Sequence, residues 1–256
     1  MLNLAMVYYG QHDSNIDALI INTQPSVLID NTPGGYWHGA CNPQTFQSRG
    51  IKVFSYIYSN YDAFPAAQNQ ALINAIAGEG SYGVFIDETS PTATGALTSL
   101  CNYAHSRGLK VIINPGVVPV DDSLYRIADY VMTDEHYTGR PPNSVESSHL
   151  SQTIVIGYDG SWTAEIAASY TKAAWGNGFA LSWHTLEYVS LPYWLQEYTG
   201  LIAPASFSQP VVSVNPAPVI ASIPVTVATA GISSATPKVI AIAAIIGGAL
   251  LIVGNS

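Results

Sequence analysis

Two pairs of adjacent carboxylates are the residues of this sequence best suited to do chemistry. Asp87 and Glu88 end one short apolar run, and Asp134 and Glu135 end another. A buried parallel strand is continuously apolar, so charge at its end indicates where the chain leaves the sheet. In (β/α)8 barrels the active site lies at this end of the strands. Because glycoside hydrolysis needs two carboxyl groups, the pattern predicts a glycoside hydrolase site.

The roles of the acids are predicted from strand alternation. Adjacent residues of a strand face opposite sides, and Glu88 shares the parity of the apolar Val84 and Ile86. We therefore expect Glu88 to face the barrel mouth as the proton donor, with its pKa raised by the apolar strand end and by Asp87. Glu135 is the expected nucleophile or electrostatic partner. Asp87 is expected to tune Glu88 or to hold a nitrogen or hydroxyl group of the sugar.

A purely structural interpretation of the same acids stays open. Some of them could cap the following helix or pair with Arg140 or Lys172. Aromatic side chains near strand ends could stack on sugar rings, although each could instead pack between a helix and the barrel. Asn114 is expected to bind substrate, or else only to turn the chain before Pro115. The other substrate-binding candidates are Tyr9, Trp37, Tyr56, Tyr58, Tyr137, Asp159, Trp162, Trp183 and His184.

The elements that would position these residues alternate along the chain. Eight strand-like runs precede residue 190, and helix-compatible stretches separate most of them. The runs are Leu4–Tyr9, Ala18–Ile21 with Val27–Ile29 as a continuation, Lys52–Tyr58, Gly83–Ile86, Lys110–Ile113, Tyr130–Thr133, Thr153–Gly157 and Phe179–Trp183. The helix-compatible stretches include Pro65–Gly78, Thr94–Arg107, Ser123–Ala128 and Thr163–Asn177. Such alternation predicts an α/β (β/α)8 TIM barrel over residues 1–207. A doubly wound sheet is the alternative, but no Gly-rich phosphate loop follows the first strand.

The chain changes character after the predicted barrel. Residues 208–237 are rich in Pro, Val, Ser and Thr and carry no charge, so they are expected to form an extended linker or stalk. Residues 238–256 form a hydrophobic C-terminal segment, expected to be a short helix. The apolar stretch 239–253 is somewhat shorter than the ~17–25 residues of a membrane span. A membrane anchor is expected, and an assembly helix packed in an oligomer is the alternative.

Composition excludes some function classes. The formal net charge is −9, and the eight basic residues are scattered, so no nucleic-acid partner is expected. The N-terminus lacks the basic region of a signal peptide, so the chain either begins at a processed terminus or reaches its compartment by another route. No Gly-x-Ser-x-Gly motif occurs, which disfavours a serine hydrolase.

The two cysteines give no metal-binding pattern. Cys41 and Cys101 lie outside any CxxC or Cys/His cluster, so no zinc site is expected, and free thiols are favoured over a disulfide. No cofactor is expected. A metal hydrolase built from His12, Asp13, Glu135 and His136 is a minor alternative.

Several motifs resemble those of spherulin-4-like proteins over about half the chain, in matching order. They are Asn31–Trp37 after the second strand, Tyr56–Tyr61 at the third strand end, Gly83–Glu88, and the series Asn114-Pro115-Gly116, Tyr125, Ala128-Asp129 and Asp134-Glu135. The resemblance implies a (β/α)8 barrel that acts on polysaccharide, since the characterised relatives cleave α-1,4-linked galactosamine-containing polymers. It implies active-site roles for Asp87, Glu88 and Glu135, and adds Asn31 to the candidates for substrate binding.

This sequence departs from the family pattern in two places. Ser59-Asn60 stands where the family usually has a segment with a basic residue, and the hydrophobic tail is not part of the pattern. Two functions therefore remain open. One is an endo-acting glycoside hydrolase at a cell surface or envelope, associated with the membrane through its C-terminus and bound to a glycan. The alternative is a structural, adhesive or virion protein on the same barrel, assembled as a homo-oligomer through its tail.

Overall fold

A computed structural model describes residues 4–32, 39–137, 139–157, 162–175, 178–181, 188–202, 242–246 and 249–253. For residues 178–181, 242–246 and 249–253 it describes the backbone alone. The chain divides into two units, residues 1–208 and 209–256, and each is described by itself.

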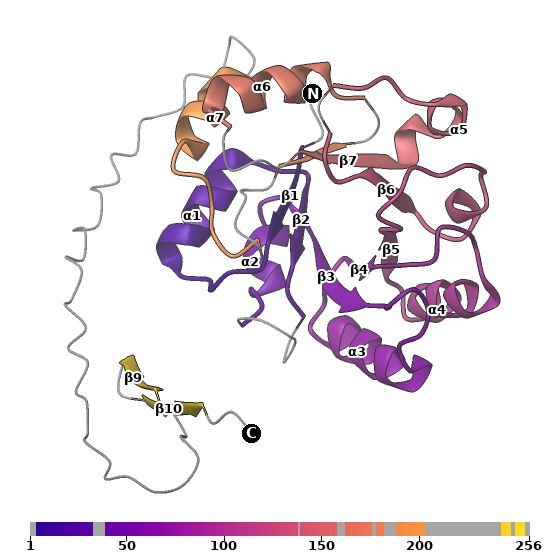
Figure 1. Cartoon of the computed structure of the whole chain (residues 1–256), viewed down its shortest axis with the longest axis horizontal. Coiled ribbons are helices and arrows are strands. Elements are labelled where there is room, and N and C mark those ends of the chain that lie inside the picture. Colours follow the sequence, from indigo (N-terminus) through magenta and orange to yellow (C-terminus); the bar gives the residue numbers. More distant parts are fainter. Residues whose placement is uncertain are drawn as a thin grey trace, which may run out of the picture. The chain divides into compact units, whose positions relative to one another are not determined.

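The first unit contains a closed barrel of eight parallel strands in chain order, with β8 paired back to β1 (Figure 1). This confirms the predicted (β/α)8 fold. The strands are β1 (Leu4–Tyr8), β2 (Val27–Asp30), β3 (Lys52–Tyr58), β4 (Gly83–Asp87), β5 (Lys110–Ile113), β6 (Tyr130–Asp134), β7 (Thr153–Gly157) and β8 (Gly178–Leu181).

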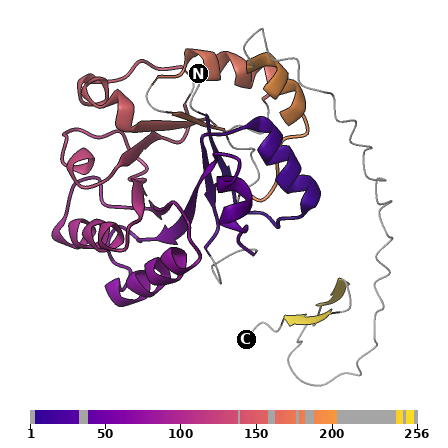
Figure 2. The ribbon, with the colours of Figure 1, turned by 180° about the vertical axis from the view of Figure 1, so that it is seen from behind.

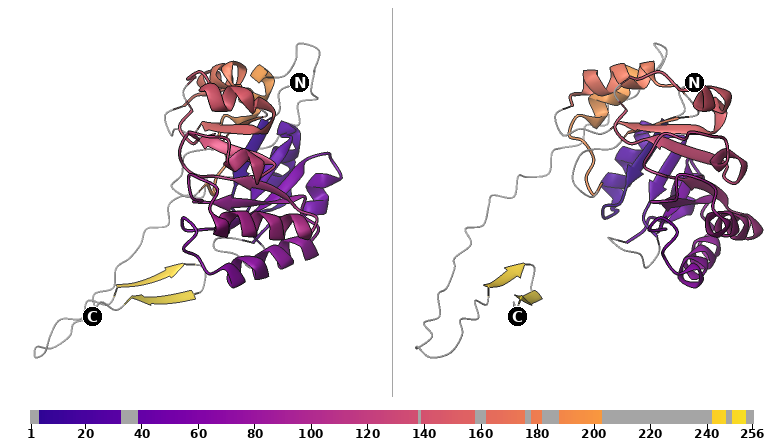
Figure 3. Two further views of the ribbon diagram at one scale, coloured as in Figure 1. Left: turned by 90° about the vertical axis from the view of Figure 1, so that its right-hand side faces the viewer. Right: turned by 45° about the vertical axis from the view of Figure 1, so that its right-hand side comes forward.

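Helices surround the strands, as the views from the front, the back and the side show (Figures 1, 2 and 3). They are α1 (Ser14–Thr23), α2 (Pro43–Gln47), α3 (Ala66–Gly78), α4 (Gly95–Ser106), α5 (Ser144–Ser148), α6 (Ala164–Ala173) and α7 (Leu195–Ile202), with 3-10 turns at Leu124–Arg126 and Leu150–Gln152. Several begin at a polar cap. The Thr94 hydroxyl accepts from the Leu97 N–H, and Asn143 with Glu146 forms a reciprocal capping box on α5.

The strands bury side chains on both faces, and the two faces have different partners. On β4, Val84 and Ile86 pack with Ile73 of α3 and Leu97 of α4 in the layer between barrel and helices. Phe85 points into the barrel interior. Its companions there are Ala5, Val7, Tyr9, Ile29, Phe54, Tyr56, Ile112, Met132, Ile154 and Ile156. This division shows which residues at each strand end can reach the mouth.

The predicted strand at Ala18–Ile21 is wrong. These residues lie within α1, whose first turn is capped by Asp13 through hydrogen bonds from the Asn15 and Ile16 N–H groups. A short apolar run fits either element, and here the cap together with an apolar helical face selects the helix. The second strand is Val27–Asp30. The predicted helix at Ser123–Ala128 is reduced to one 3-10 turn, Leu124–Arg126.

The second unit contains a hairpin where a helix was predicted. Strands β9 (Ile242–Ile246) and β10 (Ala249–Val253) pair antiparallel, from Ala249 opposite Ile246 to Val253 opposite Ile242. Two adjacent glycines, 247 and 248, each cost a helix about 1 kcal/mol relative to Ala, whereas β-branched Ile and Val favour strands. Among the described helices, none combines the length and apolarity needed to cross a lipid bilayer. Residues 208–237 of the predicted stalk lie outside the described residues.

Candidate active site

Asp87, rather than Glu88, continues the inward face of β4. Val84 and Ile86 face the helices, whereas Phe85 lies in the barrel interior. Asp87 is two residues beyond Phe85 and therefore points into the mouth. Glu88 was expected to face the mouth on the assumption that Val84 and Ile86 face the barrel interior. In the structure these two residues face the helices instead. Glu88 lies beyond the strand end in a left-handed conformation, with a φ of 47°.

Glu135 reaches the mouth because β6 carries a bulge. Along the β6–β7 pair, Met132 is opposite Ile154 but Asp134 is opposite Val155, so Thr133 is an extra residue. Ile154 faces the interior, whereas Val155 packs on the helix side. Asp134 consequently faces outward with Val155, and Glu135 turns inward. Regular alternation from Met132 would have aimed Asp134 into the barrel instead.

An ion-pair network holds the outer side of this bulge. The Arg140 guanidinium donates to Asp134 Oδ2 at 2.6 Å and makes a two-pronged contact with Glu146, at 2.8 and 2.7 Å. The Thr133 hydroxyl donates to Glu146 Oε1 at 2.6 Å, and the Glu146 carboxylate is fully buried. Asp134 is thus used structurally, as the alternative interpretation of the acids allowed.

Asn114 joins the two inward carboxylates. Its Nδ2 donates to Asp87 Oδ1 at 2.7 Å and also to Glu135 Oε1. Asn114 is buried, and its backbone is held by Ile86 O (2.9 Å) and by the Thr89 N–H (2.9 Å). An amide nitrogen carries two protons, so one side chain satisfies both acids at once.

Burial and then the nearby Glu135 charge raise the pKa of Asp87, hydrogen bonds from the Glu88 backbone, Asn114 and Tyr56 lower it, and the net result is a pKa of about 6. Two carboxylates held this close cannot both ionise freely, so one of them retains a proton more readily than an isolated acid. Asp87 is therefore suited to donate a proton in weakly acidic solution.

Tyrosines line the interior beside these acids. The Tyr9 ring meets Tyr56 edge-on at 5.2 Å and Tyr188 at 5.7 Å between centroids. Burial, with Asp87 as the next cause, raises the pKa of the Tyr9 phenol well above its usual range. Tyr9 and Tyr56 were predicted from the sequence, whereas Tyr188 was not, because it follows β8 without a strand-end motif. A 2.8 Å hydrogen bond from the Tyr9 backbone N–H to the Tyr188 carbonyl oxygen holds the two residues together.

A second group lies at the rim, around Glu88. Burial, followed by the Glu88 charge, raises the pKa of the Tyr58 phenol. Tyr61 is 60% exposed, and its backbone N–H donates to Glu88 O at 2.5 Å. Asn60, Tyr61 and Asp62 all have positive φ, between 49° and 70°, which is unfavourable for non-glycine residues. This strained loop presents Tyr61 to solvent next to Glu88. Tyr61 was not singled out from the sequence.

The remaining candidates fall into two groups. Tyr137 lies outside the mouth, because its ring is fully buried in the helix-facing core and its hydroxyl donates to Ala173 O at 3.1 Å. Trp162 is buried in the same layer against Tyr170. Asn31 is buried at the end of β2, and its side-chain oxygen accepts from the Thr32 N–H at 2.8 Å. Trp37, Asp159, Trp183 and His184 lie outside the described residues.

No protein-family model matches the sequence, and no curated protein sequence matches it either. Solved structures do resemble the fold. Aspergillus clavatus Sph3 in complex with GalNAc superposes with a TM-score of 0.62 over 78% of this chain and 97% of that chain, at 13% identity. A fungal endo-beta-N-acetylglucosaminidase of glycosyl hydrolase family 18 gives a TM-score of 0.49 over 80% and 99%, at 13% identity. The match to Sph3 supports the (β/α)8 fold that the spherulin-4-like motifs predicted.

Proposed function

We propose that this chain is a retaining, endo-acting glycoside hydrolase that cleaves an amino-sugar-containing polysaccharide, with Asp87 and Glu135 as the reacting carboxyl groups. The observation that carries the proposal is Asn114, whose single amide nitrogen contacts both acids. The two acids come from different strands and meet at the carboxyl end of the barrel, where this fold places its chemistry.

Asp87 acts first as the general acid, because its pKa of about 6 leaves it protonated in weakly acidic solution. It gives its proton to the glycosidic oxygen while a Glu135 carboxylate oxygen attacks the anomeric carbon, and the carbon–oxygen bond to the leaving sugar breaks. Asp87, now ionised, takes a proton from water. The resulting hydroxide displaces Glu135 from the anomeric carbon and releases the product.

The carboxyl separation favours retention of configuration. Because one nitrogen contacts an oxygen of each acid, the nearest oxygens lie within two hydrogen-bond lengths, below about 6 Å. Retaining enzymes hold their carboxyl groups ~5–5.5 Å apart, whereas inverting enzymes need ~6.5–9.5 Å to admit a water molecule. The Asn114 bridge therefore favours the shorter, retaining separation.

The rim supports an amino-sugar substrate. The exposed Tyr61 ring offers a stacking face, and the neighbouring Glu88 carboxylate suits a sugar ammonium group. The net charge of −9 is compatible with a partly cationic polymer. Sph3, which shares the fold, is described in complex with GalNAc. Endo-action on an α-1,4-linked galactosamine polymer follows from the motif resemblance.

The deciding experiment incubates the chain with a galactosamine-containing α-1,4 glycan and analyses the products by mass spectrometry and proton NMR. We expect oligosaccharides from the unmodified chain whose first-formed reducing ends are α. Asp87→Asn and Glu135→Gln should each release none. Glu165→Gln, an exposed acid on α6, is the matched control and should retain full activity. Release by the Asp87→Asn and Glu135→Gln variants would remove both assignments.

A second function is favoured by the C-terminal hairpin. Within the described part of the chain, β9 and β10 pair only with each other, and their sequence is wholly apolar. A lone two-stranded sheet is marginally stable in water, and unpaired strand edges join other strands or an apolar phase. The alternative is therefore a structural or adhesive protein at a cell surface or envelope, assembled or held at a membrane through residues 239–253. A folded barrel that hydrolyses no glycan, together with assembly that is lost when residues 239–253 are deleted, would favour it.

A further inference from the structure

We propose that His12, Asp30 and Cys41 bind a zinc ion on the helix-facing side of β2, apart from the Asp87–Glu135 site. No zinc site was expected from the sequence, because neither cysteine lies in a CxxC or Cys/His cluster. The fold brings them together: His12 comes from the β1–α1 loop, Asp30 ends β2, and Cys41 precedes α2. Among the described residues this is the one group of three or more such side chains with metal-binding geometry.

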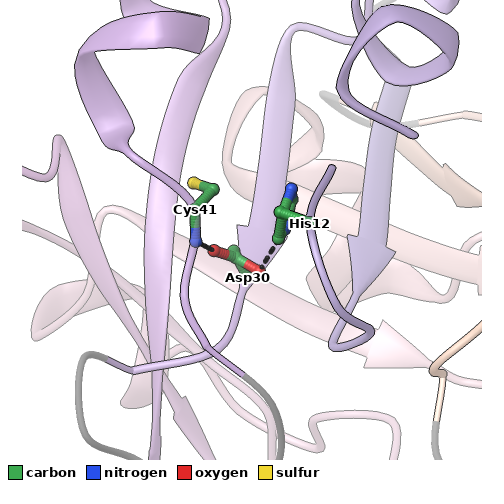
Figure 4. A group of neighbouring side chains, drawn as sticks. All are labelled: His12, Asp30 and Cys41. Atoms are coloured by element: carbon green, nitrogen blue, oxygen red, sulfur yellow. Dashed lines mark hydrogen bonds and ion pairs between the residues drawn. The ribbon is translucent and has the colours of Figure 1, made fainter. Parts of the chain in front are cut away.

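The ligand atoms are close enough to share one ion. All three lie within 4.8 Å of one another, and His12 Nε2 is 3.1 Å from Asp30 Oδ1. Figure 4 shows Asp30 between the other two residues. Zinc bonds of 2.0–2.1 Å to nitrogen and oxygen, at a tetrahedral angle, place those two ligands about 3.3 Å apart. A Zn–S bond of about 2.3 Å places the sulfur about 3.6 Å from each of the other ligand atoms, so from the 4.8 Å limit the Cys41 sulfur needs to approach by about 1 Å at most.

The surroundings hold the ligands in place. Asp17 contacts His12 Nδ1 at 2.6 Å, which leaves Nε2 for the ion in the carboxylate–histidine–metal arrangement common at zinc sites. The second oxygen of Asp30 accepts the Cys41 backbone N–H at 2.7 Å. Asp30 and Cys41 are both buried. Asp30 faces the helices because Ile29, its neighbour in β2, faces the barrel interior.

The donor set selects the metal class. Thiolate and imidazole ligands favour zinc over magnesium or calcium, which prefer oxygen. Three protein ligands leave a fourth position for water. The ion would tie both loops to the end of β2, so its effect is on stability rather than on the reaction at Asp87.

Cys101 supplies a matched control. It is also a buried free thiol, but it lies on α4, outside the group of metal-binding geometry. The test loads the untagged full chain with Co²⁺ and with Zn²⁺, and measures metal content, the thiolate-to-cobalt absorption band and Tm. We expect one ion per chain, a thiolate band, and a Tm rise of about 5–10 °C at free Zn²⁺ a hundredfold above Kd. Cys101→Ser should behave the same, whereas Cys41→Ser should lose the band and the rise.

His12→Gln keeps the result interpretable if Cys41→Ser folds poorly, and should lose at least 10-fold in zinc affinity. An unmodified chain that shows no thiolate band with Co²⁺, or a Cys41→Ser variant that binds and is stabilised like its parent, would overturn the proposal. Neither readout depends on glycan hydrolysis, so failure here leaves the Asp87–Glu135 proposal standing, and the reverse also holds.

Discussion

Asp134 and Glu135 are neighbours in the chain, yet their carboxylates serve opposite sides of the barrel wall. Glu135 shares the mouth with Asp87 through Asn114, whereas Asp134 pairs with Arg140 on the outside. The bulge at Thr133 determines which acid faces which way. Residues on the outside of the barrel wall therefore help to position a carboxylate in the mouth.

Replacing Arg140 should destabilise the barrel and impair the site. Arg140→Gln leaves the buried Glu146 carboxylate without its main partner, which we expect to cost about 3 kcal/mol and to lower Tm by about 6–12 °C. Arg126→Gln is the control, since its ion pair with Asp122 is exposed and is worth less than about 1 kcal/mol. Thermal unfolding compares the two. Equal Tm values would show that the network does not hold the bulge.

The same network gives a pH dependence of stability. Burial alone would raise the pKa of Glu146, but hydrogen bonds from Arg140 and Thr133 more than offset this, and the pKa is lowered from 4.5. A lowered carboxyl pKa stabilises the fold above the unfolded-state value, and this contribution is lost as pH falls through the folded-state value. We expect the free energy of unfolding to decline below about pH 4.5, and less steeply in Glu146→Gln. Urea titrations between pH 3 and 6 test this; identical slopes would contradict it.

The ionisation of Asp87 should depend on Glu135. Its raised pKa predicts that the acid form is lost as pH rises through about 6, so activity should fall along that limb. Glu135→Gln removes a negative charge, and the Asp87 pKa should drop below about 6 while burial keeps it above 3.8. Carboxyl-carbon NMR follows the titration even when the variant is inactive. Glu165→Gln is the control and should leave the midpoint unchanged.

Removing the Asn114 amide should slow the reaction without weakening substrate binding. Asn114→Ala withdraws a fixed donor from both carboxylates, so we expect kcat to fall by about 10²-fold with KM nearly constant. Asn74→Ala, which removes a contact with Tyr103 on exposed helix surface, is the control. An Asn114→Ala variant with unchanged kcat would reduce the residue to a turn former.

Glu88 offers the sharpest test of the assigned roles. Because it lies at the rim beside Tyr58 and not on the inward face of β4, Glu88→Gln should raise KM for a cationic glycan and leave kcat within about 10-fold of the parent. Steady-state kinetics at several salt concentrations separates the two parameters. A loss of kcat as large as in Asp87→Asn would return the proton-donor role to Glu88.

The sequence predicted the barrel and the convergence of Asp87 and Glu135 on one rim, because apolar runs that end in acids mark the ends of buried parallel strands. It could not predict which residues of β4 face the barrel interior. Both faces of such a strand are apolar, so the sequence does not distinguish Val84, which faces the helices, from Phe85, which faces the interior. The bulge at Thr133 was equally hidden, since it exists only in the register of β6 against β7. His12, Asp30 and Cys41 meet only through the tertiary fold.

The single extra residue in β6 also bears on how such barrels are compared and engineered. If the same residues paired without the bulge, with Thr133 opposite Val155, Asp134 rather than Glu135 would face the mouth. Two barrels could therefore keep the same Asp-Glu dipeptide and differ in which member meets the sugar. Aligned sequences therefore identify the carboxylate that faces the mouth only when the register of the strand is compared as well. For a designer, whether this strand pairs with or without the bulge decides which of the two carboxylates is the candidate nucleophile.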